Sequence, residues 1–504
     1  MSEYFLSIDA GTSGGKVAII DDKGTQIGFS KSKWAQYYTI SEGLDPYGYE
    51  FDSSLFWKIL LKKINEVIQE AKIDPKRIKA ISSTSQRQGC VFLDAGGDEL
   101  YAGPNRDARG LEVDTEEYME NEELYEITGH GPPFLFALSR LLWFRENEEE
   151  VYDKIKHLLT IDGWVNFRLT GRFSINDTSA AETLLFDIKG HKWSEIILDT
   201  FDIPHEILPN RLEYGKTIDS ILPEIAKEIG VNKDIPIVMS CADTQASLLG
   251  CGAFNKNSLG VVAGSTMPLQ LIIDDPVIDS NQKIWTGAFI DNLWVLESNA
   301  GSAGDIHQWF VDSILKKLGI KNPYGKFEQL VLSQPAGARG VFADLGPQIF
   351  DAQKMLQIPN GGGFSFTPIS YSFDELIDIG SFARSLIENL SYAVRANIDQ
   401  IQEVRKSSIE KIFLVGGLSR SKAFCQILAN VLDSDINVYI PEGTSIAGAI
   451  AGMIGIGYFK DYREGIREII TDYTTYYSQE DQNKEYEIIY PEWREIYNKS
   501  RIED

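Results

Sequence analysis

Residues 6–21 read LSIDAGTSGGKVAIID and residues 259–274 read LGVVAGSTMPLQLIID, so two similar segments stand about half a chain apart. In each segment an apolar run leads into a turn of small residues, and a second apolar run follows. This pattern is typical of a β-hairpin with a Gly, Ser and Thr tip. Its recurrence predicts an internal duplication of the fold.

The two segments differ at the positions where chemistry can occur. Asp9 in the first segment corresponds to Val262 in the second, and Lys16 corresponds to Leu269. One hairpin tip is therefore charged and the other is neutral. This difference suggests two loops that contribute unequally to the binding of one ligand.

Strands and helices are predicted to alternate after each hairpin. Residues 55–71 and 382–402 have helical periodicity, and residues 412–415 form a short apolar run before a glycine pair. The alternation favours an α/β class with mixed sheets covered by helices. We expect two like domains, residues 1–250 and 251–504, around a central cleft that holds the ligand.

Composition narrows the range of functions. The chain has 504 residues and a net charge of -26, which disfavours partners such as nucleic acid or an anionic membrane surface. Four scattered cysteines and no basic, apolar leader indicate a cytoplasmic protein with reduced thiols. The five histidines have no zinc spacing. The sequence leaves homo-oligomer formation open.

The segment Asp9 to Lys16 is a candidate phosphate loop. Its glycines allow backbone N–H groups to approach an anion, and its hydroxyls and lysine can donate to phosphate oxygens. It is not a Walker A loop, because Ala10 replaces the first glycine and Val17 follows the lysine. The alternative interpretation is a plain hairpin with a flexible tip.

Two glycine segments of the second half are weaker signals. Gly264-Ser265 is a weak signal by itself, and it becomes a candidate second phosphate loop because it repeats the first loop. Gly416-Gly417 joins an apolar strand to a helix, where a ligand can reach the helix N-terminus. This second segment lacks the G-x-G-x-x-G pattern of a dinucleotide fold, so a tight structural turn is an equal alternative.

Asp243 follows the apolar run of residues 235–240 in the segment SCADTQA. A carboxylate at the end of a strand, close to the expected domain boundary, is well placed to act as a general base. The alternative is that Asp243 caps the helix that follows.

Taken in order, these segments resemble the FGGY family of carbohydrate kinases over nearly the whole chain. The resemblance rests on SIDAGTSGGKVAIID, IDGWVNFRLTGRFSINDTSAAETLLFD (161–187), CADTQASLLG, VVAGSTM, LVGGLSRSKAFCQILANVL and PEGTSIAGAIAGM. It implies two duplicated domains of the actin and hexokinase type, which are ribonuclease H-like. It also implies an enzyme that binds ATP and Mg²⁺ and phosphorylates a small sugar or polyol.

The resemblance assigns roles to individual residues. Asp243 would be the general base, and Asp9 would hold Mg²⁺ through water. Lys16 stands where relatives often carry arginine. The residues implied to bind the nucleotide are Gly11, Thr12, Ser13, Lys16, Gly264, Ser265, Gly304, Gly416, Gly417 and Ser421. The residues implied to bind the sugar are Arg87, Gln88, Phe134, Asp243 and Thr244.

The substrate loop does not single out one substrate. Arg87 fits a pattern of glycerol kinases, but Gln88 replaces their acid, and xylulose kinases usually have Met-His here. The run from Tyr101 to Arg109 looks more like autoinducer kinases. Arg87 alternatively forms a surface salt bridge. We expect phosphorylation of a ketopentose such as xylulose or a related short-chain compound.

Two other functions remain as alternatives. A non-catalytic nucleotide-binding regulator would not need both Asp9 and Asp243, because binding alone requires no base. A chaperone-type ATPase of the same fold group would need an additional peptide-binding module, for which the two expected domains leave no room.

Overall fold

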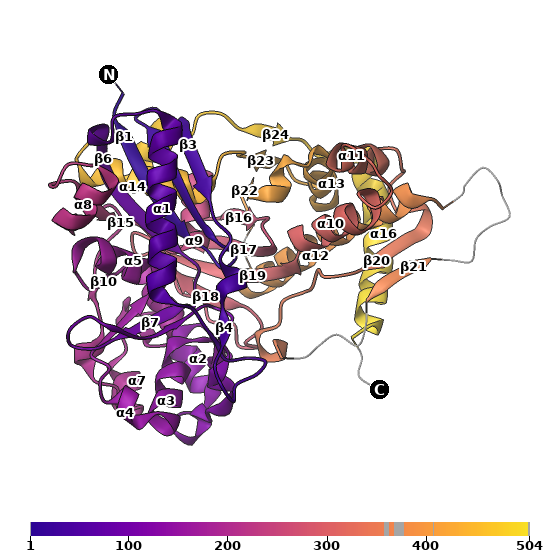
Figure 1. The fold of residues 1–504 in the computed structure, drawn as a ribbon. Coiled ribbons are helices and arrows are strands. Elements are labelled where there is room, and N and C mark those ends of the chain that lie inside the picture. Colours follow the sequence, from indigo (N-terminus) through magenta and orange to yellow (C-terminus); the bar gives the residue numbers. More distant parts are fainter. Residues whose placement is uncertain (1, 357–361, 367–376, 407, 502–504) are drawn as a thin grey trace. The chain divides into compact units, whose positions relative to one another are not determined.

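The computed structural model describes residues 2–356, 362–366, 377–406 and 408–501, which form two compact units (Figure 1). The first unit contains Met1–Phe254, Ile273–Val295 and Pro441–Thr471. The second contains Asn255–Ile272, Leu296–Ile440 and Asp472–Asp504. The contacts therefore assign two later segments to the first unit, whereas the division at residue 250 gave both to the second domain.

The first unit is built on a six-stranded mixed sheet in the order β14-β15-β6-β1-β2-β3. β1 is antiparallel to β2 and parallel to β6, which is in turn parallel to β15. The strands are β1 (Tyr4–Ala10), β2 (Gly15–Asp21), β3 (Gln26–Lys31), β6 (Ile78–Ser85), β14 (Thr217–Ser220) and β15 (Pro236–Met239). The β1–β2 pair is the hairpin expected from residues 6–21.

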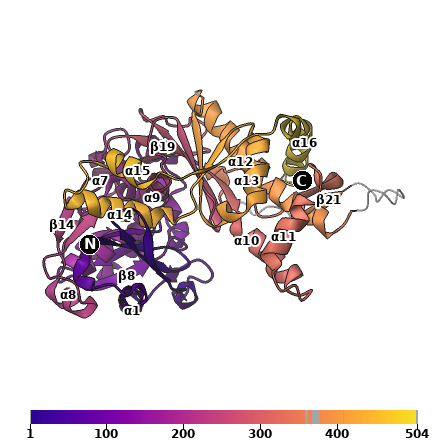
Figure 2. The same ribbon diagram turned by 90° about the horizontal axis from the view of Figure 1, so that it is seen from above.

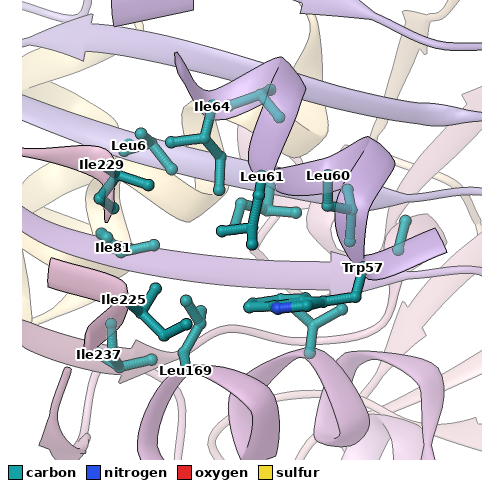
Figure 3. Packing of buried hydrophobic residues seen from close by; sticks show 14 of the residues in the cluster. Leu6, Trp57, Leu60, Leu61, Ile64, Ile81, Leu169, Ile225, Ile229 and Ile237 are labelled. Atoms are coloured by element: carbon teal, nitrogen blue, oxygen red, sulfur yellow. The ribbon is translucent and has the colours of Figure 1, made fainter. Parts of the chain in front are cut away.

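Helix α1 (Ser53–Ala71) covers one face of this sheet (Figure 3). It begins after Asp52, whose carboxylate accepts a hydrogen bond from the Leu55 N–H, and it ends at Lys72 in a left-handed conformation. Its buried side chains recur at helical spacing and pack on the sheet. They are Phe56, Trp57, Leu60, Leu61, Ile64, Val67 and Ile68.

Helix α14 (Gly443–Gly455) comes late in the chain but lies among elements of the first unit (Figure 2). Its glycines allow this position. A Cβ atom on Gly448 would lie 2.2 Å from Ser7 Oγ, and one on Gly452 would lie 3.1 Å from Phe5 Cδ1. The Gly- and Ala-rich face of α14 therefore packs directly on β1, which explains why the segment joins the first unit.

The second unit repeats the strand order of the first. Six strands of its seven-stranded sheet run in the order β19-β17-β16-β22-β23-β24, with β16 antiparallel to β17 and parallel to β22. The strands are β16 (Ser258–Val262), β17 (Thr266–Ile273), β19 (Trp294–Ser302), β22 (Lys411–Val415), β23 (Ile436–Val438) and β24 (Thr474–Tyr476). This repetition confirms the duplicated α/β fold predicted from the two hairpin segments.

All four cysteines are buried and free of disulfides. Within the described residues, no helix combines the length and the apolarity that a membrane span requires.

Candidate functional site

Three parallel strands of the first unit end at the same edge of the sheet. In the register, Ala10 of β1 pairs with Ser85 of β6, and Met239 of β15 pairs with Ser83 of β6. Asp9, Arg87 and Asp243 all lie at or just beyond these strand ends. The carboxyl edge of parallel strands is a common place for a ligand in α/β proteins.

Asp9 is buried, and among the described residues one of its two carboxylate oxygens has hydrogen-bond partners. Oδ2 lies 3.2 Å from Lys16 Nζ and accepts a hydrogen bond of 3.0 Å from the Thr444 hydroxyl. Oδ1 is also buried but has no hydrogen-bond partner among the described residues. A buried oxygen without a partner is unfavourable unless a ligand meets it, which marks Oδ1 as a candidate contact for a cation or its water.

Lys16 lies between two carboxylates. Its Nζ is 3.2 Å from Asp9 Oδ2 and 3.5 Å from Glu442 Oε2. Asp9 raises the pKa of Lys16 above its usual value; burial opposes this effect and Glu442 adds to it. Lys16 is therefore a fixed positive charge at the end of the hairpin.

The loop of residues 11–15 is held by its carbonyl groups. The Gly11 carbonyl accepts from the Trp34 indole at 2.9 Å, and the Thr12 carbonyl accepts from the Tyr38 hydroxyl at 2.6 Å. In the described part of the chain, the N–H groups of residues 11–14 donate to no protein atom. A turn with fixed carbonyls and available N–H groups is suited to anion binding, which is not expected of a plain flexible tip.

Asp243 is the first residue of helix α9 (Asp243–Gly250), and Ala242 takes the N-cap position. No side chain caps this helix, so the alternative that Asp243 serves as a helix cap is wrong. The Asp243 side chain is 31% exposed. Burial raises the pKa of Asp243 to about 7; Arg87 opposes this increase and Asp9 strengthens it. A carboxylate with this pKa can accept a proton near neutral pH.

Arg87 forms a buried ion pair. Its Nη1 lies 2.9 Å from Glu182 Oε1, and its Nε lies 3.9 Å from Asp243 Oδ1. The side chain is only 8% exposed and that of Glu182 is 1% exposed. The alternative of a surface salt bridge is therefore wrong.

Glu182 has two further partners. It accepts a hydrogen bond from Gln88 Nε2, and His130 Nε2 lies 3.7 Å from its Oε1. Burial alone would raise the pKa of Glu182, but Arg87, His130 and Gln88 outweigh burial and hold it well below its usual value. Glu182 is thus a buried anion that links Arg87 and Gln88.

The other residues predicted to bind the sugar occupy different positions. The Thr244 hydroxyl donates to Asp243 Oδ1 at 3.3 Å. Phe134 is buried in the short helix Pro133–Leu135, two residues before Phe136, whose ring centroid lies 5.7 Å from that of His130. Gln88 and Thr244 therefore contact Glu182 and Asp243 directly, whereas Phe134 forms no ring contact with this group within the described residues.

In the second unit, the predicted nucleotide residues come together around the β16–β17 turn. The Gly304 N–H donates to the Gly264 carbonyl at 3.0 Å, and the Ala303 N–H donates to the Ser265 carbonyl at 2.8 Å. A Cβ atom on Gly416 would lie 2.6 Å from the Ala263 carbonyl oxygen. Gly264, Ser265, Gly304 and Gly416 thus form one cluster of backbone.

Two further predicted nucleotide residues, Gly417 and Ser421, follow Gly416 and differ in their surroundings. A Cβ atom on Gly417 would meet nothing within 4 Å, so the space beside this residue is open. The Ser421 hydroxyl accepts a hydrogen bond of 3.1 Å from the Phe424 N–H and caps helix α13 (Lys422–Leu432). Ser421 has a clear structural role, whereas Gly417 leaves room for a ligand.

Two profiles of one protein family match the chain. The profile of the N-terminal domain of FGGY carbohydrate kinases matches residues 4–250, and that of the C-terminal domain matches residues 260–456. The chain belongs to the FGGY family of carbohydrate kinases. It is therefore a carbohydrate kinase, and FGGY kinases use ATP as the phosphate donor.

Individual relatives are similar over most of the kinase chain. YoaC of Bacillus subtilis (strain 168), which is provisionally named a sugar kinase, is 29% identical over 88% of this chain and 88% of its own. The autoinducer-2 kinase of Salmonella paratyphi A is 26% identical over 99% of this chain and 94% of its own. The crystal structure of gluconate kinase from Lactobacillus acidophilus matches with a TM-score of 0.83 and 22% identity. The match covers 99% of this chain and 98% of the gluconate kinase chain.

Four residues that contact this candidate site were not predicted from the sequence: His130, Glu182, Glu442 and Thr444. Glu182 carries a detectable signal, because it is a single charge in the otherwise small and apolar run SAAETLLF. Thr444 has no comparable signal, since a hydroxyl at the start of a helix normally indicates only a cap.

Proposed function

We propose that this protein transfers the γ-phosphoryl group of ATP to a hydroxyl of a small sugar or polyol. The hydroxyl oxygen forms a bond to the γ-phosphorus, the bond between that phosphorus and ADP breaks, and the hydroxyl proton passes to Asp243. The observation that carries the proposal is Asp243 at the strand edge, partly exposed, with a pKa raised to about 7 by burial.

The first unit offers residues suited to the phosphates. We propose that the N–H groups of Gly11, Thr12 and Ser13, together with Lys16, bind phosphate oxygens. In the second unit, we propose contacts of the nucleotide with the cluster around the β16–β17 turn. The residues of that cluster are Gly264, Ser265, Gly304, Gly416, Gly417 and Ser421.

Magnesium fits the surroundings of Asp9. No cluster of three or more His, Cys, Asp or Glu side chains able to hold a metal is found among the described residues. Mg²⁺ keeps most of its waters and is usually held by one or two carboxylates. Asp9 Oδ1, which has no hydrogen-bond partner among the described residues, fits such a site. Mg²⁺ would neutralise charge on the transferred phosphoryl group, and Asp9 would hold it, directly or through water.

For the acceptor, we propose a ketopentose such as xylulose or a related short-chain compound. Arg87 and Gln88 would bind its hydroxyls, with Thr244 beside the base and Phe134 contributing to an apolar wall. Glycerol and the signalling compound named by the autoinducer-2 kinase relatives are second candidates. The latter is supported by the run Tyr101 to Arg109, which resembles the corresponding loop of autoinducer kinases.

A coupled assay of ADP release tests the proposal. The enzyme with Mg-ATP is compared on glycerol, erythritol, xylulose, ribulose, fuculose, rhamnulose, gluconate and the autoinducer dione. We expect one compound to stand well above the rest, and Asp243→Asn to lose several orders of magnitude in kcat while nucleotide binding remains. Near-normal turnover in Asp243→Asn would remove Asp243 as the base. Nucleotide binding without turnover on any compound would favour the regulator.

A further inference from the structure

Glu182 reaches the sheet edge from a part of the chain far from the strand ends. It lies in the short helix Ala181–Thr183, and its carboxylate meets Arg87, which is 95 positions earlier. With a side chain only 1% exposed, Glu182 has little surface left for a substrate. Its effect on the acceptor site must therefore pass through the side chains that it contacts.

Among these side chains, Arg87 is the positively charged one, and it contacts both Glu182 and Asp243. The guanidinium Nη1 lies 2.9 Å from Glu182 Oε1, and the guanidinium Nε lies 3.9 Å from Asp243 Oδ1. Two carboxylates thus surround one cation. Gln88, the next residue, is also bound to Glu182, so both side chains of the 87–88 pair are oriented by one buried anion.

This arrangement determines which substrates are electrostatically acceptable. A substrate carboxylate at Arg87 would become the third anion around a single guanidinium, and like charges at such distances repel strongly in a partly buried site. A hydroxyl carries no net charge, and it can accept from a guanidinium N–H and donate to a carboxylate.

We propose that Glu182 neutralises Arg87 and so makes the acceptor site selective for uncharged polyhydroxy compounds over sugar acids. This inference rests on the proposed function and specifies its substrate class. Glu182 is a positioning and specificity residue, since it acts through Arg87 and Gln88. The property that reports this role is the ratio of kcat/KM between an uncharged compound and a sugar acid. A purely structural role of Glu182 would not change this ratio.

The test compares Glu182→Gln with the unaltered enzyme. The substitution keeps the shape of the side chain and one acceptor oxygen for Arg87, replaces the other oxygen with an NH2 group that can donate to the Gln88 amide oxygen, and removes the charge that neutralises Arg87. We measure kcat/KM for gluconate and for the best uncharged compound of the panel, and gluconate affinity by calorimetry without nucleotide. Selectivity for the uncharged compound should fall by at least about tenfold, and gluconate binding should tighten.

Two further variants serve as controls. Glu99→Gln removes a carboxylate from another Arg–Glu pair of the same unit, in which Arg168 Nη1 lies 2.8 Å from Glu99 Oε1. It should leave the selectivity ratio unchanged. Glu182→Gln combined with Arg87→Gln should abolish the gain in gluconate binding, because the gain requires the guanidinium. Glu182→Asp, which keeps the charge, should retain discrimination and keeps the test available if Glu182→Gln does not fold.

The outcomes separate the two levels of inference. A folded Glu182→Gln enzyme with an unchanged ratio, a Glu182→Asp enzyme that loses discrimination, or an unaltered enzyme that prefers gluconate would overturn the role of Glu182 while the kinase proposal stands. Absence of turnover by the unaltered enzyme on every compound would overturn the proposed function and this inference with it.

Discussion

The Thr444 hydroxyl donates a hydrogen bond of 3.0 Å to Asp9 Oδ2, although the two residues are 435 positions apart in the sequence. The bond ties the start of α14 to the carboxylate at the end of β1. Because Lys16 approaches the same oxygen, Oδ2 has two partners, whereas Oδ1 has no hydrogen-bond partner among the described residues and is the oxygen that we propose for a metal or its water. The first prediction follows from this division of the carboxylate.

Thr444→Val should weaken the response of the enzyme to magnesium. Valine keeps the shape of threonine but cannot donate, so the Asp9 carboxylate loses one constraint worth about 1 kcal/mol. We expect the Mg²⁺ concentration for half-maximal activity to rise about fivefold. Thr217→Val is the control, because that exposed hydroxyl lies 3.5 Å from the Gly455 carbonyl. An unchanged Mg²⁺ response in Thr444→Val would contradict the role of this bond.

Activity should rise with pH through neutrality. Burial raises the pKa of Asp243 to about 7, so the carboxylate is mostly protonated below that pH and cannot accept the hydroxyl proton. We expect kcat/KM for the sugar to fall about tenfold per pH unit below about 6.5 and to level off above about 7.5. ADP affinity over the same range is the control. A flat profile between pH 5.5 and 8 would exclude this titration.

Arg87→Gln should destabilise the protein because it leaves the buried Glu182 carboxylate without its main cation. The cost of breaking a buried ion pair is about 3 kcal/mol in free energy of unfolding. Adding Glu182→Gln removes the uncompensated charge and should restore much of that loss. Urea denaturation of the single and double variants measures both effects. Equal stability of the two variants would show that the pair carries little energy.

Gly416 and Gly417 should respond differently to alanine. Gly416 has a φ of 105°, and a Cβ atom there would collide with the Ala263 carbonyl, so Gly416→Ala should lower the melting temperature. Gly417→Ala should fold normally, because its surroundings are open. If Gly417 contacts the nucleotide, this variant raises the KM for ATP at an unchanged melting temperature. An unchanged KM would remove Gly417 from the nucleotide site.

The sequence predicted the fold well because the signals of the fold are local. The hairpin of residues 6–21 and its repeat at 259–274 contain their own turns and apolar runs, and the helical periodicity of residues 55–71 falls within α1 (Ser53–Ala71). Asp9 and Asp243 could also be singled out, since Asp9 lies near the end of an apolar strand and Asp243 comes shortly after one.

The rest of the site depends on contacts that no local pattern encodes. Glu182 pairs with Arg87 only because the fold brings residues 95 positions apart into contact. The position of α14 could not be predicted for the same reason: chain order places it after the second hairpin, whereas its Gly- and Ala-rich face fits closely on β1.

The two units are made of alternating segments of the chain rather than of two halves. A polypeptide cut after residue 250 would lack α14, and the surfaces of β1 and β6 beneath it, with Phe5 and Ala80, would face water. The N-terminal half can therefore not serve as a self-sufficient folding module. In this enzyme, a nonsense mutation or a recombination point near the middle of the gene should yield an insoluble fragment rather than a nucleotide- or sugar-binding domain.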